Sequence, residues 1–187
     1  FIDLGDLNAD AVTDIIAIFQ AWWGGNSPDW YLVSAVKSGT MLTDISGVSI
    51  TGAFSLNIDQ SGKIIVRDLQ RRDDEPFCCP TRPVETYYRV KKGKLEQEGI
   101  ARELTSADVA LLIPSLKRQP ERVGAAIALG VIGGKDAVSA LTRALSFKDS
   151  RFYDFHIACL EALWRNGANS VSALPTMRRS VNHEYEY

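Results

Sequence analysis

The chain has 187 residues, a length that suits one large domain or two small ones. Its apolar content of 45% is typical of a globular protein, and its formal net charge of −2 gives no bulk attraction to nucleic acid or to an anionic membrane surface. No apolar run approaches the roughly 20 residues of a membrane-spanning helix, so we expect no transmembrane segment. The small negative net charge leads us to expect no nucleic-acid partner.

An acidic loop is the first feature along the chain. The first 36 residues hold five aspartates and no lysine or arginine, and Asp6, Asn8, Asp10 and Asp14 lie close together among them. Oxygen side chains at alternate positions of a tight loop can converge on calcium, which makes these four residues a candidate calcium site. The alternative is a turn in which the same side chains hydrogen-bond the backbone without an ion. Ala11 departs from the calcium motif, which has glycine there for a positive φ angle.

The first hundred residues have the pattern of β-strands. Runs of β-branched, aromatic and alternating apolar residues predict strands at 13–19, 30–36, 53–59, 63–69, 87–91 and 94–97. The turn sequences Gln60–Gly62 and Lys92–Gly93 predict two hairpins among them. Phe54, Leu56 and Ile58 alternate with polar residues and are expected on one face. An alternating strand has one wet face, which favours an antiparallel meander.

Two residue pairs in this β segment are candidate sites. Trp22 and Trp23 are adjacent, so at least one of them should reach the outer face of its strand as a binding patch, although such aromatics are also common core residues. Cys78 and Cys79 have three possible states: a vicinal disulfide, disulfides with other cysteines, or reduced and packed thiols. Adjacent cysteines do not suit a single tetrahedral zinc ion. Cys159, on a predicted helix, is expected to be a small core residue.

Basic residues gather between Arg67 and Lys94. This stretch is either a patch for a polyanion or the solvated face of a sheet. Acidic side chains are interleaved with the basic ones, Asp68 and Glu85 among them. Mixed charges of this kind favour the solvated face.

A helical pattern begins after Gly99. Apolar spacing predicts helices near 107–117, 121–132, 135–146, 152–165 and 169–179. Pro114 and Pro175 fall inside the first and last of these, so those helices should bend or begin later. Leu160, Leu163 and Trp164 are expected to pack into the next layer of the domain. We therefore predict an antiparallel β domain over 1–103 and a helical domain over 104–187.

The helical segment repeats itself. Leu129 and Leu163 are 34 residues apart, as are Gly133 and Gly167, and this fixed period is typical of stacked helical repeats. The run from 122 to 133, RVGAAIALGVIG, resembles the short HEAT repeats of the phycobilisome-lyase type, and the resemblance covers about 108–180. It implies a short α-solenoid of HEAT-like helix pairs. Repeats of this superfamily serve bilin lyases, scaffolds and a di-iron hydroxylase, whose iron ligands are several His-Glu pairs. This chain has only His156 and His183, and one His-Glu pair cannot build a two-metal site.

The acidic loop carries a second resemblance. The run from 5 to 16, GDLNADAVTDII, resembles the Asp-rich loop of FG-GAP-type repeats. Together with the predicted 52–69 hairpin and the Cys78–Thr81 segment, it resembles a bacterial envelope β domain over about 1–98. That domain occurs in secreted proteins and lipoproteins, so the resemblance implies a secreted or lipoprotein precursor and an extracytoplasmic location, in the periplasm, the cell envelope or outside the cell.

These observations lead to one functional prediction. No Ser-His-Asp order, phosphate-binding loop or zinc-protease motif is present, so we expect a protein that is not an enzyme. We predict an α+β protein, with an N-terminal antiparallel β-meander domain followed by a short α-solenoid, that binds or scaffolds a protein partner through its HEAT-like repeats. The alternative is a bilin lyase or chaperone-like accessory factor of the phycobilisome-lyase HEAT family. No cofactor is expected apart from the calcium of the acidic loop.

Overall fold

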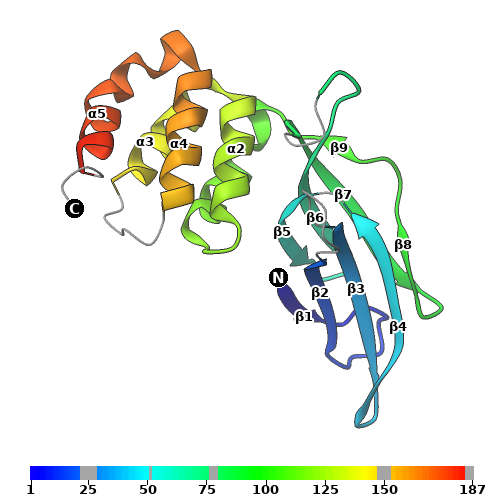
Figure 1. The fold of residues 1–187 in the computed structure, drawn as a ribbon. Coiled ribbons are helices and arrows are strands. Elements are labelled where there is room, and N and C mark those ends of the chain that lie inside the picture. The colour runs from blue at the N-terminus through cyan, green and yellow to red at the C-terminus, as the bar shows by residue number, and fades with distance from the viewer. Residues whose placement is uncertain (22–28, 51, 76–79, 147–152, 184–187) are drawn as a thin grey trace. The chain divides into compact units, whose positions relative to one another are not determined.

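A computed structural model describes residues 1–21, 29–50, 52–75, 80–146 and 153–183 (Figure 1). The protein is of mixed α+β class, with two antiparallel sheets and five α-helices among the described residues. The chain divides into two compact units. The first comprises Phe1–Pro80 and Val84–Glu103, and the second comprises Thr81–Pro83 and Leu104–Tyr187.

The β unit contains two meanders of four strands each. The first sheet has the order β1 (Ile2–Gly5), β2 (Asp14–Ala21), β3 (Asp29–Ser38) and β4 (Met41–Ile50). The second has the order β5 (Ala53–Ile58), β6 (Ile64–Gln70), β7 (Arg82–Lys91) and β8 (Lys94–Gln97), and β9 (Arg102–Glu103) also pairs with β7. Strands that follow one another in sequence are neighbours within each sheet, as a meander requires.

The two predicted hairpins are confirmed, because β5 pairs with β6 and β7 with β8. The sequence analysis missed β1, β4 and β9, and it began β7 at residue 87 instead of Arg82. β4 gave no strand signal because small and polar residues interrupt its apolar positions, as in the run Ser46–Gly47.

One apolar core lies between the two sheets. Its buried members come from both sheets and from the acidic loop: Leu7, Ile16, Ile18, Leu32, Val36, Ala53, Leu56, Ile64, Val66, Tyr88, Val90 and Leu95. Ala53 and Leu56 both belong to it because the register shifts between Ala53 and Ser55. This bulge interrupts the strict alternation that was expected for Phe54, Leu56 and Ile58.

The sheets are tied to each other along both pairs of edge strands. On one side, the backbone N–H of Ile58 donates to the Asp3 carboxylate at 3.2 Å. On the other side, the backbone N–H of Leu95 donates to the Ser46 hydroxyl at 3.0 Å. Gly5 permits the first of these approaches, because a Cβ atom there would lie 2.9 Å from the Ile58 side chain. Both contacts pair a backbone N–H group of an edge strand that has no neighbouring strand on that side.

The second unit is helical. Its elements are η1 (Ser106–Asp108), α1 (Val109–Leu112), η2 (Ile113–Lys117), α2 (Arg122–Ile132), α3 (Gly134–Ala144), α4 (Tyr153–Arg165), η4 (Gly167–Ala173) and α5 (Leu174–His183), where η marks a 3₁₀ helix. The prolines account for two departures from the predicted helices. Pro114 stands at the second position of η2 and Pro175 at the second position of α5, where a missing N–H costs least. The last helix therefore begins later than residue 169, as the sequence indicated.

Helix α2 packs on α4 at very close range. A Cβ atom at Gly130 would lie 2.6 Å from the Cβ atom of Ala162, so only glycine fits between the two helices. Leu163 is fully buried, as expected, and so is Leu129. The prediction for Trp164 is wrong, because 80% of this side chain is exposed.

Candidate functional site

The acidic loop is held by hydrogen bonds from its own backbone. The Asp6 carboxylate accepts the N–H groups of Ala9 (2.7 Å), Asp10 (3.1 Å) and Ala11 (2.9 Å). Asn8 and Asp10 accept from the backbone two residues further on, at 3.1 and 2.8 Å. The N–H of Ala11 contributes most to lowering the pKa of Asp6 below its usual value. Ala9 and Ala11 adopt positive φ angles of 65° and 64°, so the turn has the conformation that favours glycine although neither residue is one.

Asp14 joins this loop to the sheet. Its side chain is fully buried, and one carboxylate oxygen accepts the N–H of Leu7 at 2.9 Å while the other accepts the N–H of Lys37 at 2.8 Å. Leu7 is itself a core residue. A buried carboxylate that accepts two backbone N–H groups fixes the positions of the loop and of the end of β3 at the same time.

These contacts bear on the calcium prediction. The carboxylate oxygens of Asp6 and Asp14 already accept backbone N–H groups. Within the described ranges, no group of three or more His, Cys, Asp or Glu side chains lies close enough to hold a metal ion. Calcium at Asp6, Asn8, Asp10 and Asp14 stays a prediction, and the observed hydrogen bonds favour the alternative of an ion-free turn.

Of the other predicted sites, Trp22 and Trp23 lie outside the described residues, and so do Cys78 and Cys79. Cys159 is confirmed as a core residue. Its thiol is free and has no exposed surface, and burial raises its pKa to about 12. A thiol of this kind is not a nucleophile at neutral pH.

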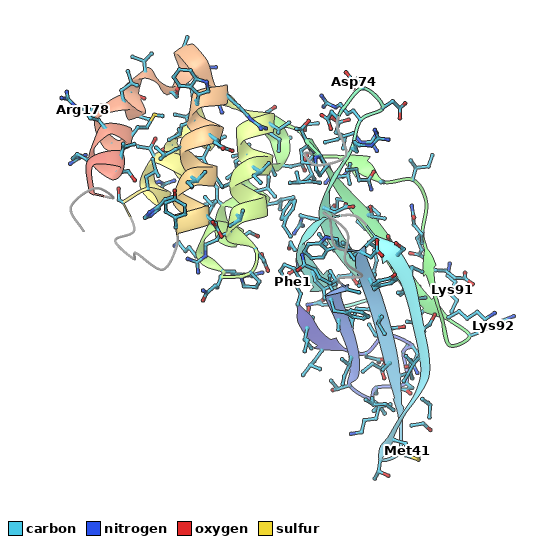
Figure 2. All side chains as sticks on the ribbon, in the orientation of Figure 1. Phe1, Met41, Asp74, Lys91, Lys92 and Arg178 are labelled. Carbon is cyan, nitrogen blue, oxygen red and sulfur yellow. The ribbon has the colours of Figure 1, made fainter. Side chains whose placement is uncertain are left out.

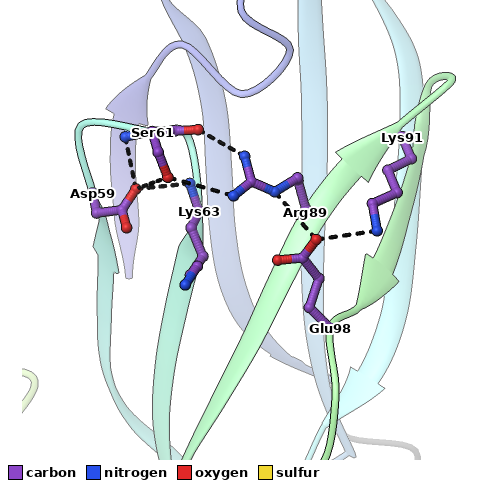
Figure 3. A network of polar contacts seen from close by, with 6 residues as sticks. All are labelled: Asp59, Ser61, Lys63, Arg89, Lys91 and Glu98. Atoms are coloured by element: carbon purple, nitrogen blue, oxygen red, sulfur yellow. Dashed lines mark hydrogen bonds and ion pairs between the residues drawn. The ribbon is translucent and has the colours of Figure 1, made fainter.

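Two cations of the basic stretch share one carboxylate on the outer face of the second sheet. Arg89 and Lys91 both contact the Glu98 carboxylate, at 3.2 and 3.1 Å (Figure 3). Arg89 also donates to the backbone carbonyl of Ser61 at 2.8 Å, which ties β7 to the turn between β5 and β6. Asp59 accepts the Ser61 hydroxyl at 2.7 Å within that turn. These pairs agree with a solvated sheet face.

A more buried cluster lies around Glu85. Its carboxylate contacts Arg67 at 2.8 Å and Arg102 at 3.1 Å, and it accepts the Tyr87 hydroxyl at 2.6 Å. Burial raises the pKa of Glu85, but the hydrogen bonds from Tyr87 and Arg102 and the two positive charges outweigh burial, so its pKa is lowered overall. The hydrogen bond to Glu85 in turn raises the pKa of Tyr87. Each charged group therefore already has partners within the protein, as a structural cluster requires.

The outer face of the first sheet has a different character. Along the middle of its strands the outward side chains are apolar or small, and the charged residues Asp29 and Lys37 lie on the same face at the two ends of β3: Ile2, Leu4, Ile15, Ala17, Phe19, Tyr31, Val33, Ala35, Ile45, Gly47 and Ser49 are the uncharged members. Ile2 and Ile45 are 75% and 71% exposed, and the rings of Phe19 and Tyr31 stack at 5.5 Å. Exposed apolar patches often mark contact surfaces, but the two charges on this face lie at its opposite ends, so its apolar middle has no charge pattern that would select one partner over another.

An open groove of about 610 Å³ lies between α4 and α5 of the helical unit. Four residues of each helix line it: Leu160, Glu161, Trp164 and Arg165 from α4, and Leu174, Met177, Arg178 and Val181 from α5. The apolar residues recur at helical spacing, so each helix contributes one apolar ridge. Trp164 and Leu174 are 80% and 54% exposed. The groove thus combines a concave shape with a large aromatic side chain that nothing among the described residues covers.

The sequence analysis did not find this groove. It placed Trp164 in the core because the residue lies beside Leu163 in an apolar run. The helical phase separates the two, since Leu163 has no exposed surface and Trp164 has most of its surface free. A helical wheel of α4 alone cannot show which of two apolar faces has a neighbouring helix.

Comparison of the chain with protein-family models, with curated proteins and with solved structures found no match in any of the three. The resemblances to HEAT-like repeats and to an FG-GAP loop therefore depend on the residues of this chain alone and stay predictions. None of the described helices is long and apolar enough to cross a membrane.

Proposed function

We propose that this protein is not an enzyme and that it binds a protein partner through HEAT-like repeats in its helical unit, outside the cytoplasm. The extracytoplasmic part of the proposal is supported by the resemblance of residues 1–98 to an envelope β domain. The binding part is supported by the geometry of the groove between α4 and α5.

Two features support the repeat. Gly133 and Gly167, which are 34 residues apart, both follow a helix with positive φ angles of 72° and 50°. Leu129 and Leu163, at the same separation, are both fully buried. Repeats of this kind bury one face against a neighbour and leave another free for a partner. In this proposal, α2 with α3 forms one helix pair and α4 with η4 and α5 forms the next.

The observation that carries the proposal is the exposure of Trp164 inside a groove. A tryptophan that is 80% exposed on a helix leaves a large apolar surface in water. Tryptophan is also the residue most often found at the energetic centres of protein interfaces. The flanking residues Leu160, Leu174 and Met177 extend this apolar surface along the groove.

Site-specific photo-crosslinking tests the proposal. Benzoylphenylalanine at position 164 in cells that make the full chain should yield a discrete adduct with one protein. Tyr153 is the matched control, because it is an aromatic residue of the same helix, is 57% exposed and does not line the groove. Equal adduct patterns from positions 153 and 164, or no protein adduct from position 164, would contradict the proposal.

A further inference from the structure

We infer that the groove between α4 and α5 accepts an amphipathic helix of the partner whose apolar stripe is flanked by carboxylates. This inference rests on the proposed function and specifies the partner's chemistry. It follows from three independent observations: how the same positions behave one repeat earlier, the size of Trp164, and the charges at the groove.

The positions of α4 that line the groove can be compared with the positions of α2 that lie 34 residues earlier. Helix α2 binds α4 through the surface around Gly130, and 34 residues further on the same position is Trp164. Ala126, which is fully buried, corresponds in the same way to Leu160. The residues of α4 that line the groove are therefore the counterparts of residues on α2, whose neighbour is a helix.

The other wall of the groove gives the same result. Leu141, Ala144 and Leu145 at the end of α3 are buried. Their counterparts 33 residues further on, Leu174, Met177 and Arg178, line the groove instead. Both walls thus consist of positions that are covered in the preceding repeat, and the cover on the α2 wall is a helix. A helix in an apolar groove is also a common mode of peptide recognition.

The size of Trp164 distinguishes between two possible occupants of the groove, a partner helix and one more repeat stacked in the same way. At Gly130 even one added carbon would lie 2.6 Å from the next helix, and an indole is far larger than one carbon. A helix that docked on α4 as α4 docks on α2 would collide with Trp164. The occupant must instead leave a gap for the indole, for example through small residues one turn apart, which a partner with its own sequence can supply.

The charges at the groove select an acidic helix. Arg165 and Arg178 line it from opposite helices, both are exposed, and neither forms an ion pair with any residue that the structure describes. Figure 2 shows Arg178 on the outer side of α5. The lining contains one acidic residue, Glu161. Two unpaired guanidinium groups against one carboxylate give the groove a net positive charge, and an acidic flank on the incoming helix complements it.

Three synthetic helical peptides test the inference with the full chain. They share one apolar face and carry glutamate, glutamine or lysine on the flanking positions, and their dissociation constants are measured by fluorescence anisotropy at low and high salt. We expect the glutamate peptide to bind about 3- to 10-fold more tightly than the glutamine peptide, as two exposed ion pairs would give. We expect high salt to remove most of that difference, and the lysine peptide to bind most weakly.

Variants of the groove residues test whether the preference for the glutamate peptide arises in the groove. Arg165→Gln/Arg178→Gln should abolish the preference for glutamate, so that the glutamate and glutamine peptides bind this variant with equal affinity. The charge-matched control is Lys135→Gln/Arg143→Gln, two exposed residues of α3 that do not line the groove, which should leave the preference intact. Trp164→Ala should weaken all three peptides, by about 30-fold for a central interface residue.

The outcomes separate the two claims. Equal binding of all three peptides, or tighter binding of the lysine peptide, overturns the acidic partner while a specific adduct from position 164 still supports the proposed function. Binding of none of the peptides overturns the amphipathic helix as occupant. A preference for glutamate that survives Arg165→Gln/Arg178→Gln overturns the assignment to this groove.

Discussion

Removal of the Asp14 carboxylate should unfold the β unit at markedly lower denaturant concentration. Asp14 is fully buried, and its two oxygens accept the N–H groups of Leu7 and Lys37 at 2.9 and 2.8 Å. A hydrogen bond to a charged group contributes roughly 1.5–3 kcal/mol, and the N–H groups left behind would lose their partner. Asp14→Ala should therefore lower the free energy of unfolding by about 3–5 kcal/mol. Asp14→Asn should cost about 2–3 kcal/mol, because its amide can accept only one of the two N–H groups.

Urea unfolding followed by tryptophan fluorescence measures this loss. A Trp164→Phe background, in which every remaining tryptophan precedes residue 31, restricts the signal to the β unit. With a slope of about 1.5 kcal/mol per molar urea, the midpoint of Asp14→Ala should fall by about 2 M or more. Asp29→Asn is the control, because Asp29 is exposed at the end of the same sheet, and its midpoint should stay within about 0.3 M. Similar midpoints for the two variants would refute the clamp that Asp14 provides.

The same titration decides between the two readings of the acidic loop. If the oxygens of Asp6 and Asp14 serve the backbone, the midpoint is the same in millimolar calcium and in chelator. A midpoint that rises with calcium would instead support the calcium prediction, because a ligand that binds only the folded state stabilises it.

Four further predictions concern single residues. Ala11→Gly should stabilise the β unit by about 0.5–1 kcal/mol in the same urea assay, because the φ angle of 64° is strained for alanine; a loss of stability would contradict this. Glu85→Gln should cost about 2 kcal/mol at neutral pH, and since the folded state lowers the pKa of Glu85, the difference from the wild type should shrink as the pH falls below about 4. In a chain without the other two cysteines, Cys159 should resist thiol reagents at pH 8 until the helical unit unfolds, and rapid labelling of the native chain would show that its burial is wrong. Gly130→Ala should cost about 1–3 kcal/mol despite its better helix propensity, and Ala162→Gly should restore part of the loss.

Local signals predicted the two hairpins and the helices α2, α3 and α4 well. The turn Lys92–Gly93 has positive φ angles at both residues, 50° and 73°, so its sequence alone specified the connection between β7 and β8. Pro175 likewise placed the start of α5. β1 was missed because four residues, Ile2–Gly5, contain too little alternation to register, and only pairing with β2 makes them a strand. Pairing of that kind is a tertiary effect that local pattern does not report.

The roles of the acidic loop residues were only half predictable. The motif identified which side chains have oxygens to offer, and Ala11 marked the position of positive φ. It did not distinguish Asp14 from Asp6, although one is fully buried and the other is not. Burial of Asp14 results from the pairing of β2 with β3, which brings the N–H of Lys37 to its carboxylate across 23 residues. No spacing within the loop contains that information.

The proposed repeat and the groove can be compared position by position. A fixed period predicts which positions are equivalent, and equivalent positions normally share their contacts. Gly130 and Trp164 are equivalent in sequence but opposite in size, and the structure gives one a helix at the closest possible range and leaves the other in water. A glycine cannot be replaced by tryptophan in a contact that excludes even a methyl group, so the neighbour of α4 cannot repeat the neighbour of α2. In the proposed repeat, the position at which the two copies differ most in volume is therefore the one that we propose contacts the partner.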